Sequence, residues 1–136
     1  MMVVVAIIGL LAAMAIPNFL RFQARARTAE AKTNLKGFFV SAKSYFAERA
    51  TYACVACGFS PERNNLYNYN WGGGGGQLPT AAGALSCTAA AGPTAGQSQS
   101  GFTATAMGQI DADITCDGWS ISDYNNLTHF SNDVDN

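Results

Sequence analysis

The first 20 residues of the chain carry no charged side chain, and a proline, Pro17, stands near the end of this apolar run. As an α-helix rising ~1.5 Å per residue, the run would be ~30 Å long, which matches the hydrocarbon core of a bilayer. A helix that is apolar on every side must be shielded from water. We therefore predict that Met1 to Leu20 spans a membrane or packs against other apolar helices.

The apolar run has two simpler explanations. One is a plain membrane anchor for a small domain outside the cytoplasm. The other is a cleaved signal peptide, which we consider weaker. No basic residue stands before the run, and the apolar periodicity continues beyond it into Phe22, Ala26 and Leu35.

Beyond Arg21 the apolar residues follow the 3.6-residue period of an amphipathic helix. One face holds Leu35, Phe38, Phe39, Ala42, Tyr45 and Phe46. The opposite face is polar and holds Lys32, Lys36, Lys43 and Glu48. We expect one helix from about Met2 to Ala50, interrupted or bent near Pro17, because proline lacks the N–H of a helical hydrogen bond. Its second half, residues 21–50, would pack against a globular part.

Two segments after the helix alternate in the manner of β-strands. In residues 66–71 the side chains of Tyr67, Tyr69 and Trp71 share one face, and a run of five glycines follows. Residues 101–107 alternate in the same way, and the glycine after them is expected to turn the chain.

A hairpin is expected next along the chain. Residues 110–116 would form a strand, and Asp117-Gly118 is a dipeptide that favours a type I′ turn. Trp119 and Ile121 would then lie on the return strand. Helix and strands together predict an α+β fold, in which a long N-terminal helix, residues 1–50, packs on a small antiparallel sheet within a head, residues 51–136.

A long connection interrupts the predicted head. Residues 72–100 form a loop rich in Gly, Ala and Ser, and from Gln77 onward it has too few large apolar side chains to fold alone. Since a loop of this length is uncommon within a compact domain, we expect Cys87 to pin it. Residues 123–136 are polar apart from Phe130, and we interpret them as a surface tail.

Charge and cysteine content exclude several classes of function. The formal net charge is −1, and all eight Lys and Arg residues lie between Arg21 and Arg63, so no basic face is left for nucleic acid as a main partner. Four cysteines with a single histidine, His129, suit disulfides in an oxidising compartment better than a metal site. We therefore expect the head to lie outside the cytoplasm.

The segment Cys54-Val-Ala-Cys57 has the spacing of a redox motif, but it follows the end of a helix instead of preceding one. We interpret it as structural and do not expect an enzyme. Of the three possible pairings we prefer Cys54–Cys57 with Cys87–Cys116, which would tie the long loop to the sheet. A bridge from Cys54 or Cys57 to Cys87 would instead tie the loop to the helix end.

Three aspartates could suggest a calcium site: Asp111, Asp113 and Asp117. Their spacing does not meet the EF-hand pattern, because no glycine-centred loop or distal glutamate accompanies them. We expect no metal and no cofactor.

The stretch MVVVAIIGLLAAMAIPNFLRFQARARTAEAKTNLK resembles the start of type IV pilins, especially the type IVa group. SYFAERATYA resembles the end of the pilin helix, GFSPERNN resembles the loop after it in pilins of delta-proteobacterial type, and ATAMGQIDADITCDGWSIS resembles the terminal sheet. The resemblance implies a pilin-like fold and a structural subunit of a cell-surface filament for motility, adhesion or DNA uptake. The alternative is a major pseudopilin of a type II secretion system.

The resemblance also implies partners and a location. The chain would form a helical homopolymer, interact with an inner-membrane pilus assembly machinery, and lie in the inner membrane before assembly. Pilins begin with Phe-Thr-Leu-Ile-Glu and a methylated amino terminus ahead of the apolar stretch, whereas the sequence here starts after that point. Either the sequence continues upstream, or the subunit assembles without those residues.

Site residues are expected along the helix. The filament core would include Met1, Val5, Ile8, Leu11, Met14, Phe19 and Phe22. The resemblance implies that the stretch between Gly9 and Pro17 loses helical order in the filament, and a kinked helix is the alternative. Inter-subunit salt bridges are expected from Arg21, Arg25, Arg27 and Glu30, with Glu48 as a further acidic partner, although a solvated charged face would show the same pattern.

Overall fold

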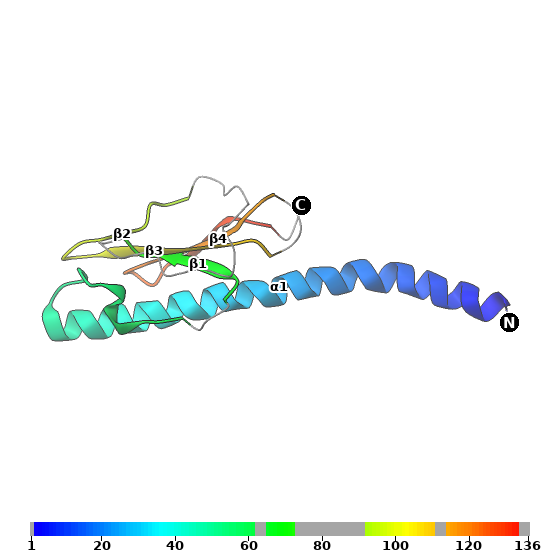
Figure 1. Cartoon of the computed structure of the whole chain (residues 1–136), viewed down its shortest axis with the longest axis horizontal. Coiled ribbons are helices and arrows are strands. Elements are labelled where there is room, and N and C mark those ends of the chain that lie inside the picture. Colours follow the sequence, from blue (N-terminus) through cyan, green and yellow to red (C-terminus); the bar gives the residue numbers. More distant parts are fainter. Residues whose placement is uncertain (1, 62–64, 73–91, 111–113, 134–136) are drawn as a thin grey trace.

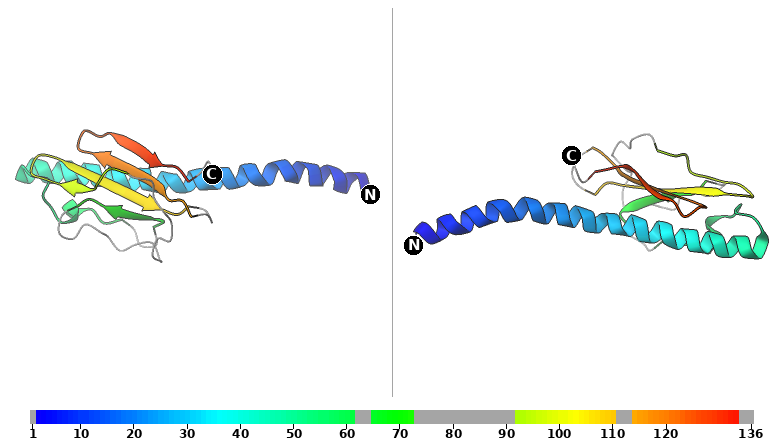
Figure 2. Two further views of the ribbon diagram at one scale, coloured as in Figure 1. Left: turned by 90° about the horizontal axis from the view of Figure 1, so that it is seen from above. Right: turned by 180° about the vertical axis from the view of Figure 1, so that it is seen from behind.

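The computed structural model describes residues 2–61, 65–72, 92–110 and 114–133. One long helix, α1, carries a small antiparallel sheet on its C-terminal half, and the N-terminal half extends beyond the sheet (Figure 1). From behind, the sheet lies along one side of the helix, and from above it covers the C-terminal half of the helix (Figure 2). The α+β fold predicted from the sequence is confirmed.

Helix α1 runs from Met2 to Arg49, a length of 48 residues. It continues through Gly9 and Pro17 without interruption and curves gently along its apolar half (Figures 1 and 2). In this single chain Pro17, which lacks the N–H of a helical hydrogen bond, therefore does not end the helix. The loss of helical order between these two residues was predicted for the filament and stays a prediction.

The strands are β1 (Tyr67–Asn70), β2 (Gly96–Gln97), β3 (Phe102–Gly108), β4 (Asp117–Ser122) and β5 (Leu127–Ser131), and a short 3₁₀ helix, η1, spans Ala56–Gly58. Their order across the sheet is β1-β3-β4-β5, and β2 also pairs with β3. All the pairings are antiparallel. Because β4 occupies one side of β3, β1 and β2 lie end to end along its other side.

The core forms where the amphipathic half of α1 meets the sheet. The helix contributes a buried stripe of Thr28, Ala31, Leu35, Phe38 and Ala42. The sheet contributes Tyr67, Tyr69 and Trp71, the three aromatic residues that were predicted to share a face.

Phe38 is central to this contact. Its ring stacks on the indole of Trp71 with centroids 4.9 Å apart, and it meets the ring of Phe102 edge-on at 5.3 Å.

The predicted turn at Asp117-Gly118 is wrong, because both residues lie in β4. Asp117 pairs with Gly108 and Gly118 pairs with Met107, so the chain reverses between Gly108 and Asp117. Ile114, Thr115 and Cys116 do not continue a strand, apart from a single bridge at Thr115. The carboxylate of Asp117 is fully buried among partners, which holds this residue inside the sheet. Trp119 and Ile121 do lie on the strand that follows the reversal, as expected.

The predicted surface tail is also wrong in its first part. Residues 127–131 form β5, which pairs with β4, and the ring of Phe130 lies against Gly118 and Gly92. Further on, Asp133 is buried, and its carboxylate accepts hydrogen bonds from the backbone N–H of Ile110 at 3.2 Å and from the hydroxyl of Thr115 at 2.6 Å. The C-terminal segment therefore completes the sheet.

The long loop can be followed only at its ends. Most of residues 72–100, including Cys87, lie outside the described residues. From residue 92 onward the structure describes the segment again, and its Gly96 and Gln97 pair with Thr103 and Phe102 as β2.

Candidate assembly interface

The apolar half of α1 has no partner within the described chain. Its large side chains are exposed, with 71% of the surface of Val5 and 68% of that of Phe19 open to solvent. Ile8, Leu11, Met14 and Phe22 are similarly exposed, and Met1, the remaining predicted core residue, lies outside the described residues. We refer to residues 2–20 as the rod.

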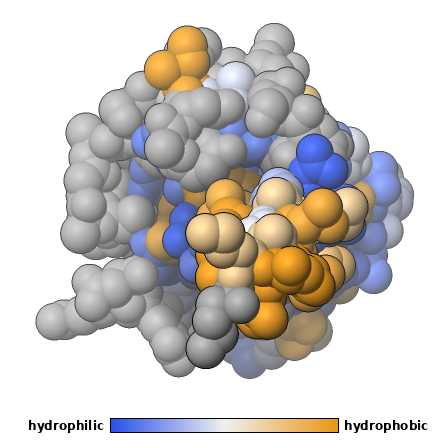
Figure 3. All heavy atoms as spheres, turned by 90° about the vertical axis from the view of Figure 1, so that its right-hand side faces the viewer, coloured by the Kyte–Doolittle hydropathy of each residue, from blue (hydrophilic) through white to orange (hydrophobic). Residues whose placement is uncertain are grey.

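An end-on view shows the hydrophobic side chains of the rod gathered in front of the head (Figure 3). By length and composition, α1 is also apolar enough to cross a membrane. The structure therefore presents an apolar surface that requires lipid or other apolar helices as its surroundings.

Three polar contacts fix the head to α1 between Arg27 and Asn34. The guanidinium of Arg27 donates a hydrogen bond to the carbonyl of Ile110. The carboxylate of Glu30 accepts one from the backbone N–H of Leu66 at 2.8 Å. The side-chain amide of Asn34 donates to the hydroxyl of Tyr69 at 2.8 Å.

These contacts change the interpretation of the four charged residues predicted to bridge subunits. Arg27 and Glu30 both bind backbone groups of their own head, so the structure places them in an intramolecular clamp. Arg21 and Arg25 are exposed, and within the described ranges neither forms an ion pair. The sequence offered no sign of this division, because Leu66 and Ile110 are far from the helix along the chain.

A buried polar cluster inside the head also went unnoticed in the sequence. The carboxylate of Asp117 accepts hydrogen bonds from the hydroxyl of Tyr67 at 2.5 Å and from the indole N–H of Trp119 at 2.7 Å. Its other oxygen lies 2.6 Å from Nε2 of His129. The imidazole of His129 stacks on Trp119, with ring centroids 4.0 Å apart. The cluster joins β1, β4 and β5.

Two tyrosines of the core titrate abnormally. Burial raises the pKa of Tyr67, and the hydrogen bond to Asp117 raises it further because it favours the neutral phenol. Burial likewise raises the pKa of Tyr69, and the hydrogen bond from Asn34 opposes part of that shift. Both phenols therefore stay neutral in the folded head at an alkaline pH at which an ordinary tyrosine ionises.

Cys54 and Cys57 form a disulfide directly after α1. Gln97 on β2 lies against it, with its side-chain amide within hydrogen-bond distance of the backbone of Cys54. The bridge thus sits where the helix end meets the sheet and is built as a structural tie. Cys116 is also disulfide-bonded. The preferred pair Cys87–Cys116 cannot be described, because Cys87 lies outside the described residues.

Of the three aspartates considered for calcium, Asp111 and Asp113 lie outside the described residues, and Asp117 is committed to the buried cluster. The described residues hold no group of three His, Cys, Asp or Glu side chains that could bind a metal.

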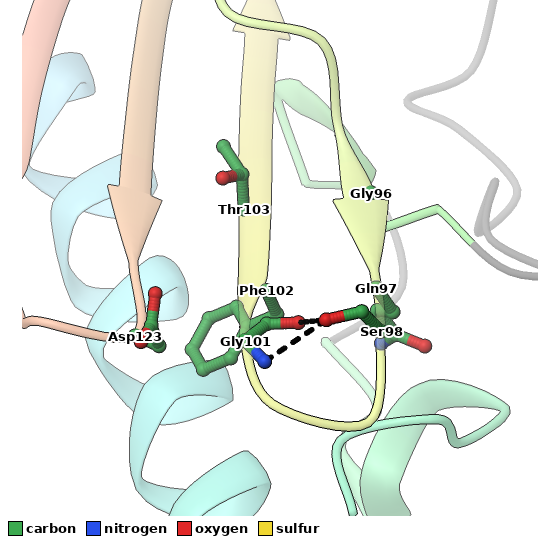
Figure 4. Close-up of a pocket in the computed structure, with 7 residues that line it drawn as sticks. All are labelled: Gly96, Gln97, Ser98, Gly101, Phe102, Thr103 and Asp123. Atoms are coloured by element: carbon green, nitrogen blue, oxygen red, sulfur yellow. Dashed lines mark hydrogen bonds between the residues drawn. The ribbon is translucent and has the colours of Figure 1, made fainter.

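A shallow depression lies at the turn between β2 and β3 (Figure 4). Its lining includes Gln97, Ser98, Phe102, Thr103 and Asp123. The hydroxyl of Ser98 donates a hydrogen bond to the carbonyl of Gly101 and accepts one from its backbone N–H, both at 3.0 Å. These two hydrogen bonds close the turn.

Comparisons with known proteins agree with this geometry. Residues 22–78 match the sequence model of a family described as type IV pilin PilA. The type IV major pilin protein PilA of Myxococcus xanthus (strain DK1622) is 56% identical over 71 residues. Over the matched residues the chain is similar to type IV pilins.

The aligned part amounts to 51% of this chain and 32% of the Myxococcus protein. The chain therefore spans about a third of the length of the curated relative that it matches. The family match begins just after the rod and covers the clamp residues Arg27, Glu30 and Asn34 together with β1.

Proposed function

We propose that this chain is a type IV pilin, a structural subunit of a pilus, and that it polymerises through its rod into a cell-surface filament. One observation carries the proposal: a fully exposed apolar rod continues as the same helix into a folded head. The rod is soluble in a bilayer, and outside a bilayer it can be shielded by the rods of other subunits. Motility, adhesion and DNA uptake are all compatible with such a filament.

The energy available for this association is large. Removing an exposed Val, Leu, Ile, Phe or Met side chain from water contributes about 1.5–3 kcal/mol. Over the rod this amounts to tens of kcal/mol before the entropy of assembly is subtracted. Head contacts would then mainly set the register of neighbouring subunits.

Charged side chains along α1 support a defined register between neighbouring subunits of the filament. Arg21 and Arg25 are exposed next to the rod and form no ion pair with any described residue, and Glu48 is exposed near the other end of the helix. We propose that one or both arginines pair with Glu48 of a neighbouring subunit in the filament. Arg27 and Glu30 hold the head at a fixed position on the helix.

Before assembly the subunit would lie in the inner membrane and be delivered to a pilus assembly machinery there. A non-enzymatic role agrees with the pilin relationship. The matched proteins are pilins, so no observation favours the pseudopilin alternative.

The test uses two valines of similar exposure at opposite ends of the molecule. Val5 lies in the rod, and Val55, with 76% of its surface exposed, lies in the disulfide loop beyond the helix end. We expect Val5→Asp to abolish filaments in electron micrographs of sheared cell-surface material and Val55→Asp to leave them intact. Normal filaments from Val5→Asp, or sheared filaments that lack this chain, would contradict the proposal.

A further inference from the structure

A short, mostly exposed segment of α1 lies between the rod and the buried part of the helix; within it only Ala24 and Arg27 are partly buried against the head. The rod ends at Leu20, and the first fully buried residue of the helix is Thr28. The seven residues between them, 21–27, are here termed the neck. At ~1.5 Å per residue the neck is ~10 Å long.

This length corresponds to the polar layer of a membrane. A bilayer is ~40–45 Å thick in total around a hydrocarbon core of ~30 Å, which leaves ~5–8 Å of headgroup region on each side. Arg21 directly follows the uncharged rod, and a charged side chain is costly inside the hydrocarbon core, so the edge of the core is expected near Leu20. With the edge at this position, the neck crosses the headgroup layer, and the head begins in water.

The neck carries two exposed guanidinium groups at this depth. Arg21 and Arg25 are four residues apart, so they lie on the same face of the helix, about one turn from each other. Both are exposed, and in the part of the chain that the structure describes neither pairs with a carboxylate. The third arginine of the neck, Arg27, is turned toward the head, where it binds the carbonyl of Ile110.

Arginine is well suited to a phosphate at a membrane surface. Its planar guanidinium donates two parallel hydrogen bonds to phosphate oxygens, and its long apolar stem can lie along lipid while the charge reaches the headgroup. Two such side chains on one face form a site for one or two phosphate groups.

We propose that Arg21 and Arg25 bind the phosphate groups of lipid headgroups in the unassembled subunit and so set the depth of the rod in the bilayer. This inference rests on one part of the proposed function, namely that the rod lies in a membrane before assembly. When the subunit enters the filament, Arg21 and Arg25 leave the lipid phosphate and pair with the carboxylate of a neighbouring subunit instead.

Solid-state NMR of the full chain tests the contact directly. The chain, with ¹³C-labelled arginine, is reconstituted into phosphatidylcholine and phosphatidylglycerol vesicles in phosphate-free buffer. We expect the guanidinium carbon signal to be dephased by lipid ³¹P, and most of this dephasing to be lost in Arg21→Gln/Arg25→Gln. The control Arg49→Gln should keep it, because Arg49 lies at the far end of α1 over the ring of Tyr45.

The remaining outcomes each decide against the inference. Absence of dephasing in the unmodified chain, or equal dephasing in the double variant, overturns it. A chain in a phosphorus-free detergent is measured with added inorganic phosphate, and dephasing as strong as in vesicles would assign the site to free phosphate instead of lipid.

The filament assay is independent of this measurement. A chain that contacts lipid phosphate but forms no filaments would contradict the proposed function and leave the lipid contact standing. A chain that is released from vesicles by alkaline extraction would contradict the membrane stage itself.

Discussion

Asp117 shows how a single residue can hold several elements together. A buried carboxylate without partners would be strongly destabilising, and its two oxygens here contact side chains from β1, β4 and β5. The ammonium of Lys32, on α1, also lies 4.4 Å from the centre of the Trp119 ring, so the helix takes part in the same cluster. Removing any one donor would leave part of a buried charge without compensation.

The raised pKa values of Tyr67 and Tyr69 predict a loss of stability in alkali. Their ordinary pKa is about 10, and burial raises it in the folded head. The stabilisation is therefore fully present below about pH 10 and is lost as the pH rises above that value, because unfolded phenols ionise first. Urea unfolding of the full chain in detergent should show a constant midpoint to about pH 9 and a decline above pH 10.

Substitution of Tyr67 separates its titration from its packing. Tyr67→Phe should reduce the alkaline decline and lower stability at neutral pH by about 1–3 kcal/mol, since Asp117 loses a donor. Tyr124→Phe is the matched control, because 86% of the surface of Tyr124 is exposed. The interpretation fails if Tyr67→Phe and the unmodified chain decline equally with pH.

At the scale of elements, the parts with strong local periodicity were predictable. The stripe through Leu35 and Phe38 indicated the packed half of α1, and the alternation of Tyr67, Tyr69 and Trp71 indicated β1. In both cases apolar side chains repeat at the period of the helix or strand, so the local sequence is enough to predict the element.

The elements that were missed depend on distant partners. Asp117-Gly118 carries a local turn signal, but the hydroxyl that binds Asp117 comes from a residue 50 positions away. β5 is an edge strand in which Thr128 and His129 are exposed, so its sequence resembles that of a polar surface tail. Only its pairing with β4 shows that it is a strand. The clamp contacts of Arg27 and Glu30 were unpredictable for the same reason.

Gly118 explains how β5 fits against β4. A methyl group at Gly118 would lie 2.5 Å from the ring of Phe130, whereas one at Gly96 would meet nothing within 4 Å. Gly118→Ala should therefore lower the free energy of unfolding by about 1–3 kcal/mol, the usual cost of overpacking. Gly96→Ala should be neutral or slightly stabilising. Urea denaturation of both variants measures the difference.

A double-mutant cycle assigns this cost to the aromatic ring. In a Phe130→Ala background the space above Gly118 is empty, so Gly118→Ala should lose most of its effect. An unchanged cost in that background would show that the ring of Phe130 is not the obstacle.

At the scale of the whole molecule, the proposed function requires one helix to serve two surroundings, a membrane and a filament. Its rod is exposed in the single chain and continuous through Gly9 and Pro17. A membrane, which offers no other hydrogen-bond partners, favours this continuous form. A filament can satisfy backbone groups between neighbouring chains, so the cost of proline inside a helix, about 3 kcal/mol, can be relieved there by local unwinding.

This argument predicts an extended or irregular segment between Gly9 and Pro17 in the filament. Pro17→Ala restores the N–H that can bond the carbonyl of Ala13, so the variant filament should show helical density through this segment. The neighbouring Asn18→Ala, which changes no backbone donor, should behave as the unmodified chain. Cryo-electron microscopy of all three filaments makes the comparison. Continuous helical density through Ile16 in the unmodified filament would mean that the helix continues through Pro17 in the filament, as it does in the single chain.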